Sequence, residues 1–254
     1  MNRTGRRSFL LAALATGVAL ATPVGRAFAA TPPTVDGSLN LRDIGGYPVG
    51  SSSVVRRGLV YRSGTLSLLT DKGVGQLAAL GLTEVVDFRT ASEVATQGPD
   101  RLPAGVKRVS TPIGDPPAAA AHLATGSPDP KQLAIYQGYV SNASWRAGYA
   151  DTVRRLLDGA QRPMLYHDSA GAHRAGWLTA VLFTTIGMSK AQVYAEYLES
   201  NDALGGTYAY PEYLDAAFAR ADQDFGSFHD FLTIGLGLTP PQITRLSTVL
   251  LTSA

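Results

Sequence analysis

The sequence predicts an α/β fold with a central, mostly parallel sheet that is flanked by helices. One observation carries this prediction, and a second excludes a repeat architecture. Short apolar segments with the length of buried strands alternate with longer segments of helical character. This alternation is typical of βαβ units, in which successive strands run parallel and helices cover the faces of the sheet. No repeat period stands out along the chain, so a repeat architecture is not indicated.

The first βαβ unit covers residues 59–89. Residues 59–63 (LVYRS) are predicted to form a strand, and Asp71 to Leu80 are predicted to form a helix with Thr70 as its N-cap. Residues 84–89 (EVVDFR) follow as a second, buried strand. Asp87 lies near the carboxyl end of this strand, which is the edge of an α/β sheet where ligands bind.

The middle of the chain has a different composition. The stretch from Pro112 to Pro130 is rich in Pro, Ala, Gly and Asp, which indicates an excursion over the surface. Tyr136 to Leu157 are predicted to be mostly helical, with an interruption near residues 141–144. We therefore expect a helical segment before the third strand.

The third strand is predicted at residues 162–167 (RPMLYH), and a strongly apolar helix is predicted from Ala175 to Ile186. Between them lies a loop of small and polar residues, 168–174 (DSAGAHR). This order is typical of an anion cradle, because consecutive loop amides and the N-terminus of the helix point at one spot. A tight strand-to-helix connection without a ligand is the alternative.

The composition excludes several classes of protein. The chain has 254 residues, of which 45% are hydrophobic and 17% charged, and it contains no cysteine. It is too apolar and too weakly charged for a disordered chain. Without cysteine there are no disulfides, no cysteine-ligated zinc, no iron–sulfur cluster and no cysteine nucleophile. No grouping typical of a divalent-metal site stands out, and we expect no cofactor.

Residues 1–29 have the features of a twin-arginine signal peptide. Arg6 and Arg7 precede an apolar run that is too short to remain as a membrane span, and residues 27–29 (AFA) match a cleavage site. We therefore expect export, with a secreted or extracytoplasmic mature protein that forms a single domain at residues 30–254. An uncleaved anchor or a buried helix is the alternative.

The charge of the mature chain argues against two kinds of partner. Residues 1–29 contain four Arg and no acid, so their removal changes the formal net charge from +2 to −2. A chain without positive surplus is not expected to bind nucleic acid, nor to hold a membrane through a polybasic contact.

Residues 167–174 resemble the active-site loop of protein-tyrosine phosphatases, H-C-x-x-G-x-x-R. The likeness is closer to the atypical bacterial tyrosine and phosphoinositide phosphatases, whose loop reads H-C-x-x-G-K-D-R-[ST]-G. Further segments match that family in the same order: 40–47 (NLRDIGGY), 61–64 (YRSG), 86–90 (VDFRT) with Glu93, 197–201 and 225–239. The resemblance covers nearly the whole mature chain and implies a tyrosine-phosphatase-like fold with a helical lid insertion.

Four loop positions depart from that pattern, which favours natural divergence over an engineered substrate trap. His167, Gly171 and Arg174 are retained. The departures are Asp168 in place of the catalytic Cys, Ala172 in place of Lys, His173 in place of Asp and Ala175 in place of Ser or Thr.

The resemblance implies which residues contact the ligand. In the family, a thiolate attacks phosphorus, Arg binds the equatorial oxygens, and an acid protonates the leaving group. By position, the ligand contacts expected here are the loop residues Ser169, Ala170, Gly171 and Ala172 together with Arg174 and Arg62. The catalytic candidates are Asp168, His173, Arg174 and Asp87.

Asp168 changes the electrostatics expected of the cradle. Its carboxylate is ionised at neutral pH and is attracted by the same amides and by Arg174, so it competes with an incoming anion. Two negative groups about 4 Å apart repel by roughly 1 kcal/mol in water and by several times that inside a protein. An Asp nucleophile usually works with a magnesium ion to offset this repulsion. We therefore expect dianionic phosphate to bind less tightly than it would without Asp168.

The other two candidates have alternatives as well. His173 is either a general base paired to a carboxylate or a residue that holds the loop and Asp168. Asp87 is either a surviving acid or the partner of Arg62 or Arg89 in a salt bridge. His167 is expected to be structural, since it lies on a buried strand.

Three functions follow from these residues, and the sequence leaves open whether the chain is an enzyme. The first is an exported phosphatase-like protein that binds a phosphorylated or otherwise anionic ligand and hydrolyses phosphoesters without cysteine. The second is a pseudophosphatase, a binding module that has lost turnover. The third is a repurposed acid–base enzyme that acts on a substrate without phosphate through Asp168, His173 and Arg174.

Overall fold

A five-stranded sheet forms the centre of the molecule in the computed structural model, which describes residues 33–114 and 126–254. The strand order is β1-β4-β7-β5-β6. The strands are β1 (Arg42–Asp43), β4 (Val60–Ser63), β5 (Glu84–Asp87), β6 (Lys107–Ser110) and β7 (Met164–His167). The signal peptide predicted at residues 1–29, and residues 115–125 of the predicted excursion, lie outside the described residues.

The prediction of a mostly parallel sheet is confirmed. Strand β7 pairs in parallel with β4 on one side and with β5 on the other, and β5 pairs in parallel with β6. Only the edge pair β1–β4 is antiparallel within this sheet. A second, three-stranded sheet has the order β2-β3-β8, formed by Pro48–Val49, Ser53–Val55 and Leu251–Ser253.

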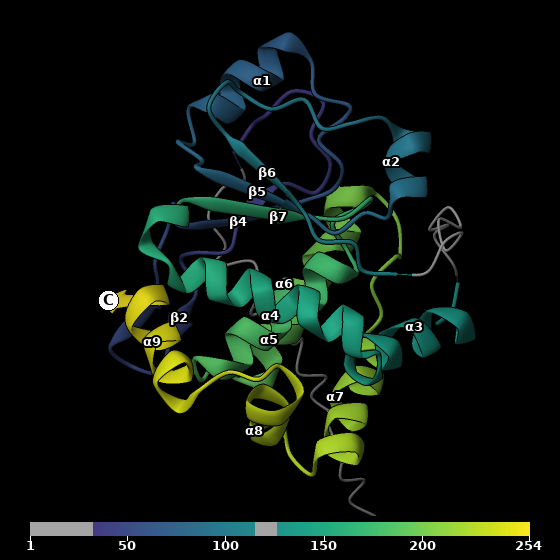
Figure 1. Ribbon diagram of the computed structural model, residues 1–254, viewed down its shortest axis with the longest axis vertical. Coiled ribbons are helices and arrows are strands. Elements are labelled where there is room, and N and C mark those ends of the chain that lie inside the picture. Colours follow the sequence, from purple (N-terminus) through teal and green to yellow (C-terminus); the bar gives the residue numbers. More distant parts are fainter. Residues whose placement is uncertain (1–32, 115–125) are drawn as a thin grey trace, which may run out of the picture.

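Helices cover both faces of the central sheet (Figure 1). Helices α1 and α2 lie on one side, and α3 to α6 lie on the other. The helices are α1 (Asp71–Ala78), α2 (Ala91–Gln97), α3 (Pro130–Ser141), α4 (Ala143–Leu157), α5 (Arg174–Thr185), α6 (Lys190–Leu204), α7 (Pro211–Phe225), α8 (Phe228–Asp230) and α9 (Pro240–Leu250). A 3₁₀ turn at Gly159–Gln161 and a π-helical turn at Phe231–Gly235 complete the helical segments of the described chain.

The two faces of the sheet belong to two apolar clusters, which explains the continuous apolar strands. Val85 and Leu165 pack in the smaller cluster with α1, whereas their neighbours Val86 and Tyr166 pack in the larger one. Successive residues of a strand point to opposite faces, so a sheet covered on both sides needs apolar residues at consecutive positions.

The elements predicted from local signals are confirmed, with small shifts at their ends. Thr70 caps α1, since its Oγ1 accepts a 3.0 Å hydrogen bond from the amide of Gly73. The predicted interruption near residues 141–144 is the break between α3 and α4 at Asn142. The side chain of Asn142 caps α4. Among the described residues, none of the helices combines the length and the apolarity needed to cross a bilayer.

Candidate functional site

The loop of residues 168–173 connects the central strand β7 to the buried helix α5, at the carboxyl edge of the sheet. Gly171 has φ +74°, and a Cβ atom there would lie 2.4 Å from the backbone carbon of Ser63. Only glycine fits this close approach without strain. The loop is therefore pressed against the end of β4, and its amides face inward.

Asp168 occupies the centre of this loop. Its Oδ1 accepts hydrogen bonds from the amides of Ala170 at 2.9 Å and Gly171 at 2.5 Å, and its Oδ2 accepts one at 3.0 Å from the amide of Ala175. The side chain is 1% exposed. The amides of the loop and of the first turn of α5 thus surround a carboxylate that the chain itself provides.

Arg174 forms a two-pronged ion pair with Glu93. The Nη1 and Nη2 atoms each donate a 2.7 Å hydrogen bond to a different oxygen of the Glu93 carboxylate. Nη1 also donates to the carbonyl oxygens of Phe88 and Ile113 at 3.1 Å. Burial lowers the pKa of Arg174, but Glu93 and Asp168 raise it above its ordinary value, so the guanidinium stays charged and paired.

Glu93 is the functional residue whose importance the sequence did not reveal. Besides Arg174, its carboxylate accepts hydrogen bonds from Ser169 Oγ at 2.7 Å and from the amide of Thr90 at 2.8 Å. Burial would raise the pKa of Glu93, but these donors and the charge of Arg174 lower it to about 2. The T-x-x-E signal of a capping box at residues 90–93 predicts the contact with Thr90, but nothing local predicts the contact with Arg174.

Arg62 is paired as well. Its Nη1 donates to both oxygens of Glu196 at 2.9 and 2.7 Å, and Glu196 also accepts from Nε of Arg42 at 2.8 Å. The carboxylate is 1% exposed, and the two arginines hold its pKa below its ordinary value against the effect of burial. The guanidinium groups of Arg62 and Arg174 are thus both matched by carboxylates.

Asp87 is placed differently from its predicted role as an acid. It pairs with Arg89 at 2.9 Å and with Arg108 at 2.6 Å, and the Arg62 alternative is not realised. Burial would raise the pKa of Asp87, but His167, Arg89 and Arg108 lower it well below its usual range. An aspartate held as an anion is a poor proton donor, so these contacts favour the salt-bridge alternative over the proton-donor role.

Asp87, Asp100 and His167 bring three potential metal-ligating atoms within 4.8 Å of one another. Arg89 and Arg108 both donate to Asp100 as well as to Asp87, so two guanidinium groups already neutralise the two carboxylates. Two carboxylates paired with two arginines fit a buried ion-pair network better than a cation site. His167 is fully buried and contacts Asp100 at 3.0 Å and the carbonyl of Asp168 at 3.2 Å, in keeping with a structural role.

His173 stands just before α5 and faces a group of tyrosines. Its Nδ1 lies 3.2 Å from the hydroxyl of Tyr136, which in turn lies 2.7 Å from the hydroxyl of Tyr197. Both tyrosines are fully buried. The sequence predicts a carboxylate as the partner of a general base, whereas the partner of Nδ1 is the Tyr136 hydroxyl. General base and structural residue both stay as alternatives for His173.

The remaining predicted contacts belong to the loop backbone and its anchors. Ser169 accepts from Gln97 at 2.9 Å in addition to its bond with Glu93, and the carbonyl of Ala170 accepts from Asn40 at 3.2 Å. Ala172 is fully buried. The structure therefore brings together all the predicted loop residues. Arg62 contacts the loop at the carbonyl of Gly171 while it pairs with Glu196, whereas Asp87 belongs to a separate ion-pair group.

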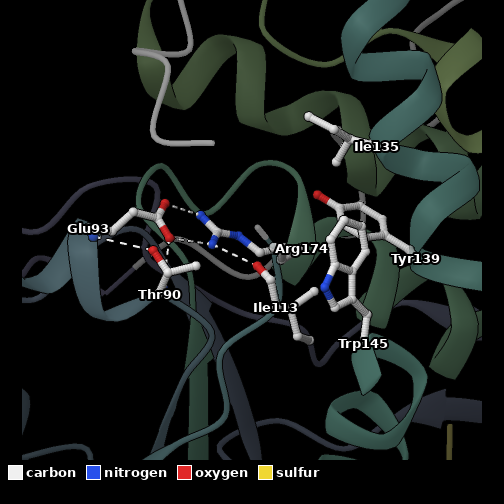
Figure 2. A pocket seen from close by; sticks show the side chains of 8 residues that line it. Thr90, Glu93, Ile113, Ile135, Tyr139, Trp145 and Arg174 are labelled. Carbon is white, nitrogen blue, oxygen red and sulfur yellow. Dashed lines mark hydrogen bonds and ion pairs between the residues drawn. The ribbon is translucent and has the colours of Figure 1, made fainter. Parts of the chain in front are cut away.

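A small pocket lies beside the Glu93–Arg174 pair (Figure 2). Its cavity volume is about 30 Å³. The pair and Thr90 line one side, and the rings of Tyr139 and Trp145 stand across from them. Its other lining residues are Ile113, Gly114 and Ile135.

Comparisons with known proteins identify similar sequences and structures. A family model described as "Tyrosine phosphatase family" matches residues 33–252. The triple specificity protein phosphatase PtpB of Mycobacterium tuberculosis is 29% identical over 194 residues, which cover 66% of this chain and 68% of that protein. A putative tyrosine-protein phosphatase of Cupriavidus necator is 27% identical over 235 residues, which cover 80% of this chain and 84% of that protein. Among solved structures, P. aeruginosa TpbA aligns over 84% of this chain and 98% of that chain, with a TM-score of 0.44 and 20% identity.

Proposed function

This chain belongs to the tyrosine phosphatase family, and from that premise we propose that it is a pseudophosphatase, a binding protein that has kept the phosphate-binding loop without phosphatase turnover. The chain contains no cysteine, so the thiolate chemistry of the loop is lost. Asp168 stands where the family has its cysteine, and its contacts decide between binding, hydrolysis and other chemistry.

The observation that carries the proposal is the position of the Asp168 carboxylate. It accepts from three amides of the loop and of α5, which are donors that would otherwise serve a bound anion. A phosphate dianion arriving beside this carboxylate would meet repulsion of roughly 1 kcal/mol in water and several times that in a buried site. Arg174 offers little compensation, because Glu93 already neutralises it.

Hydrolysis with Asp168 as the nucleophile is less favoured by the same hydrogen bonds. Three amides donate to the carboxylate, two to Oδ1 and one to Oδ2, so an attack on phosphorus would have to compete with the hydrogen bonds that hold the side chain. Amide donors also favour the ionised carboxylate by stabilising its charge, which makes its oxygens weaker nucleophiles.

A repurposed acid–base enzyme is the second candidate, and one observation favours it. His173 is oriented by Tyr136, which is itself held by Tyr197 in a buried chain of hydrogen bonds. A preorganised imidazole is suited to moving a proton, and its chain neighbour Arg174 lines the pocket. This candidate needs a substrate without phosphate, for the electrostatic reasons given above.

Titration calorimetry with inorganic phosphate tests the central claim. We expect Asp168→Ala to bind phosphate at least about 10-fold more tightly than the wild type, because the competing charge is removed. Asp71→Ala removes the same charge from a fully exposed position and serves as the control. Equal affinity of the wild type and Asp168→Ala would contradict the proposal, as would turnover of p-nitrophenyl phosphate by the wild type.

We also propose that residues 1–29 direct export, so that the mature protein acts outside the cytoplasm. The adjacent Arg6 and Arg7, the apolar run and the AFA cleavage pattern support this proposal. Replacing both arginines with Lys is expected to retain the protein inside the producing cell. Unchanged export of that variant would contradict the twin-arginine route.

A further inference from the structure

We propose that Asn40 is a positioning residue of the loop, and that the scaffold keeps the loop amides directed inward even when the Asp168 carboxylate is removed. Asn40 lies outside the loop, just before β1, and reaches it from the rear. This inference rests on the proposed function in one respect, since it takes the inward amides as the donors for a bound anion.

Three consecutive carbonyl groups of the loop accept hydrogen bonds from the surrounding scaffold. The pairs, with the donor first, are Thr65 N to Ser169 O at 3.1 Å, Asn40 Nδ2 to Ala170 O at 3.2 Å, and Arg62 Nη2 to Gly171 O at 2.6 Å. The donors come from β4, from the turn that follows it and from the segment that leads into β1. The outer side of the loop is therefore held by groups that do not depend on what occupies its centre.

Each of these contacts fixes the direction of an inward amide. A peptide unit is planar and almost always trans, so its carbonyl and its amide point in opposite directions. Asn40 holds the carbonyl of Ala170 outward, and the amide of the same unit, that of Gly171, donates to Oδ1 of Asp168 at 2.5 Å. Thr65 acts in the same way on the preceding unit, whose amide donates to Oδ1 at 2.9 Å. Both amides are thus oriented twice, by the scaffold and by Asp168.

The backbone of Asn40 has a conformation that few residues adopt. Its φ is +51°, and Asn40 is the only residue other than glycine with a positive φ among residues 33–114 and 126–254. Asparagine is one of the few residues that tolerate this left-handed region. Asn40 is 6% exposed, and with this backbone its side chain reaches the loop carbonyl.

Arg42 determines which end of the Asn40 side chain faces the loop. Arginine is a donor only, and its Nη1 donates to Oδ1 of Asn40, which leaves Nδ2 for the carbonyl of Ala170. Arg42 is itself held by Glu196, which accepts from its Nε at 2.8 Å. Since Glu196 also holds Arg62, two adjacent carbonyls of the loop are tied to α6 through one carboxylate.

The alternative is that Asp168 organises the loop around itself. A carboxylate that accepts from the amide two residues further on stabilises a turn by itself, and Asp168 makes this contact with Ala170. In that case the loop would rearrange once the carboxylate is removed. The two possibilities therefore predict different loop shapes for Asp168→Ala.

Crystal structures of two variants, grown without phosphate or sulfate, test the shape of the loop. In Asp168→Ala we expect the peptide between Ala170 and Gly171 to keep its orientation, with its carbonyl on Asn40. In the double variant Asn40→Gly/Asp168→Ala we expect this peptide to turn or to take several orientations, because glycine keeps the positive φ but removes the donor. A rearranged loop in Asp168→Ala would overturn the inference, as would an unchanged peptide in the double variant.

Phosphate titration gives a second readout, which a loss of stability alone does not change. Loss of one well-oriented amide donor to an anion predicts that Asn40→Gly weakens phosphate binding to Asp168→Ala by about 10-fold. Asn201→Ala in the same background is the matched control, since Nδ2 of Asn201 donates to the carbonyl of Ala209 at 2.8 Å, between α6 and α7. We expect this control to lower the free energy of unfolding and to leave phosphate affinity unchanged. Equal phosphate affinities of the Asn40 and Asn201 variants would overturn the inference.

Failure of this inference is distinguishable from failure of the proposed function. Turnover of p-nitrophenyl phosphate by the wild type, or no gain of phosphate affinity in Asp168→Ala, would contradict the pseudophosphatase. The two crystal structures would still decide whether Asn40 orients the loop. Improved phosphate affinity in Asp168→Ala that Asn40→Gly leaves unchanged would contradict the positioning role alone.

Discussion

The guanidinium of Arg62 donates a 2.6 Å hydrogen bond from Nη2 to the carbonyl oxygen of Gly171, which joins the end of β4 to the loop. The residue expected to contact a ligand therefore holds the loop in shape instead. Glu196 fixes Arg62 from the other side through Nη1. The loop, β4 and α6 are connected through this one buried arginine.

Glu196→Gln is expected to destabilise the protein by about 3 kcal/mol, because two buried guanidinium groups lose the charge that compensates them. Denaturant unfolding measures the loss. Glu199→Gln is the matched control on the same helix, since Glu199 is 3.9 Å from Arg42 and its side chain is 23% exposed. An equal decrease in the free energy of unfolding in both variants would contradict a special contribution of the Arg62–Glu196 pair.

Acid should weaken the fold through Glu93. Its pKa falls from an ordinary value of 4.5 to about 2 in the folded chain, so the folded state prefers the ionised form. This contribution is fully present above pH 4.5 and is lost as the pH falls from there toward 2. Thermal unfolding as a function of pH should show a slope in this window that Glu93→Gln reduces, corresponding to about 1–2 kcal/mol. An unchanged slope would exclude Glu93 as a main contributor.

Asp87→Asn is expected to act on stability and not on ligand binding. Asp87 and Arg89 are both fully buried, so removal of the charge leaves guanidinium groups uncompensated at a cost of about 3–5 kcal/mol. Denaturant unfolding, and titration with inorganic phosphate in the Asp168→Ala background, should be measured on the same sample. A stable variant that has lost only ligand binding would restore the role of Asp87 as a site residue.

Asp168→Cys is expected to gain hydrolysis of p-nitrophenyl phosphate, because the amides that now hold the carboxylate would stabilise a thiolate. Wild type and Asp168→Ser, assayed with and without magnesium, should remain inactive. Activity of the wild type that depends on magnesium would instead indicate an aspartyl nucleophile.

The sheet, the loop and the caps could be predicted because their signals are local. Thr70 stands at the start of a helical segment, and the small residues after His167 predict the loop that leads into α5. The ion-pair partners could not be predicted in this way. Arg174 meets Glu93 across 81 positions, and Arg62 meets Glu196 across 134, so each pairing depends on the packing of the whole fold. Several carboxylates compete for the same arginines in the sequence, and only burial decides among them.

The carboxylate seated in the loop has a consequence for how the protein responds to its surroundings. A site that depends on a solute is stabilised in proportion to how much of that solute is present. Here the occupant is tethered to the backbone one residue from the strand, and dilution or dialysis cannot remove it. At neutral pH the loop should therefore keep one shape whether phosphate is present or absent.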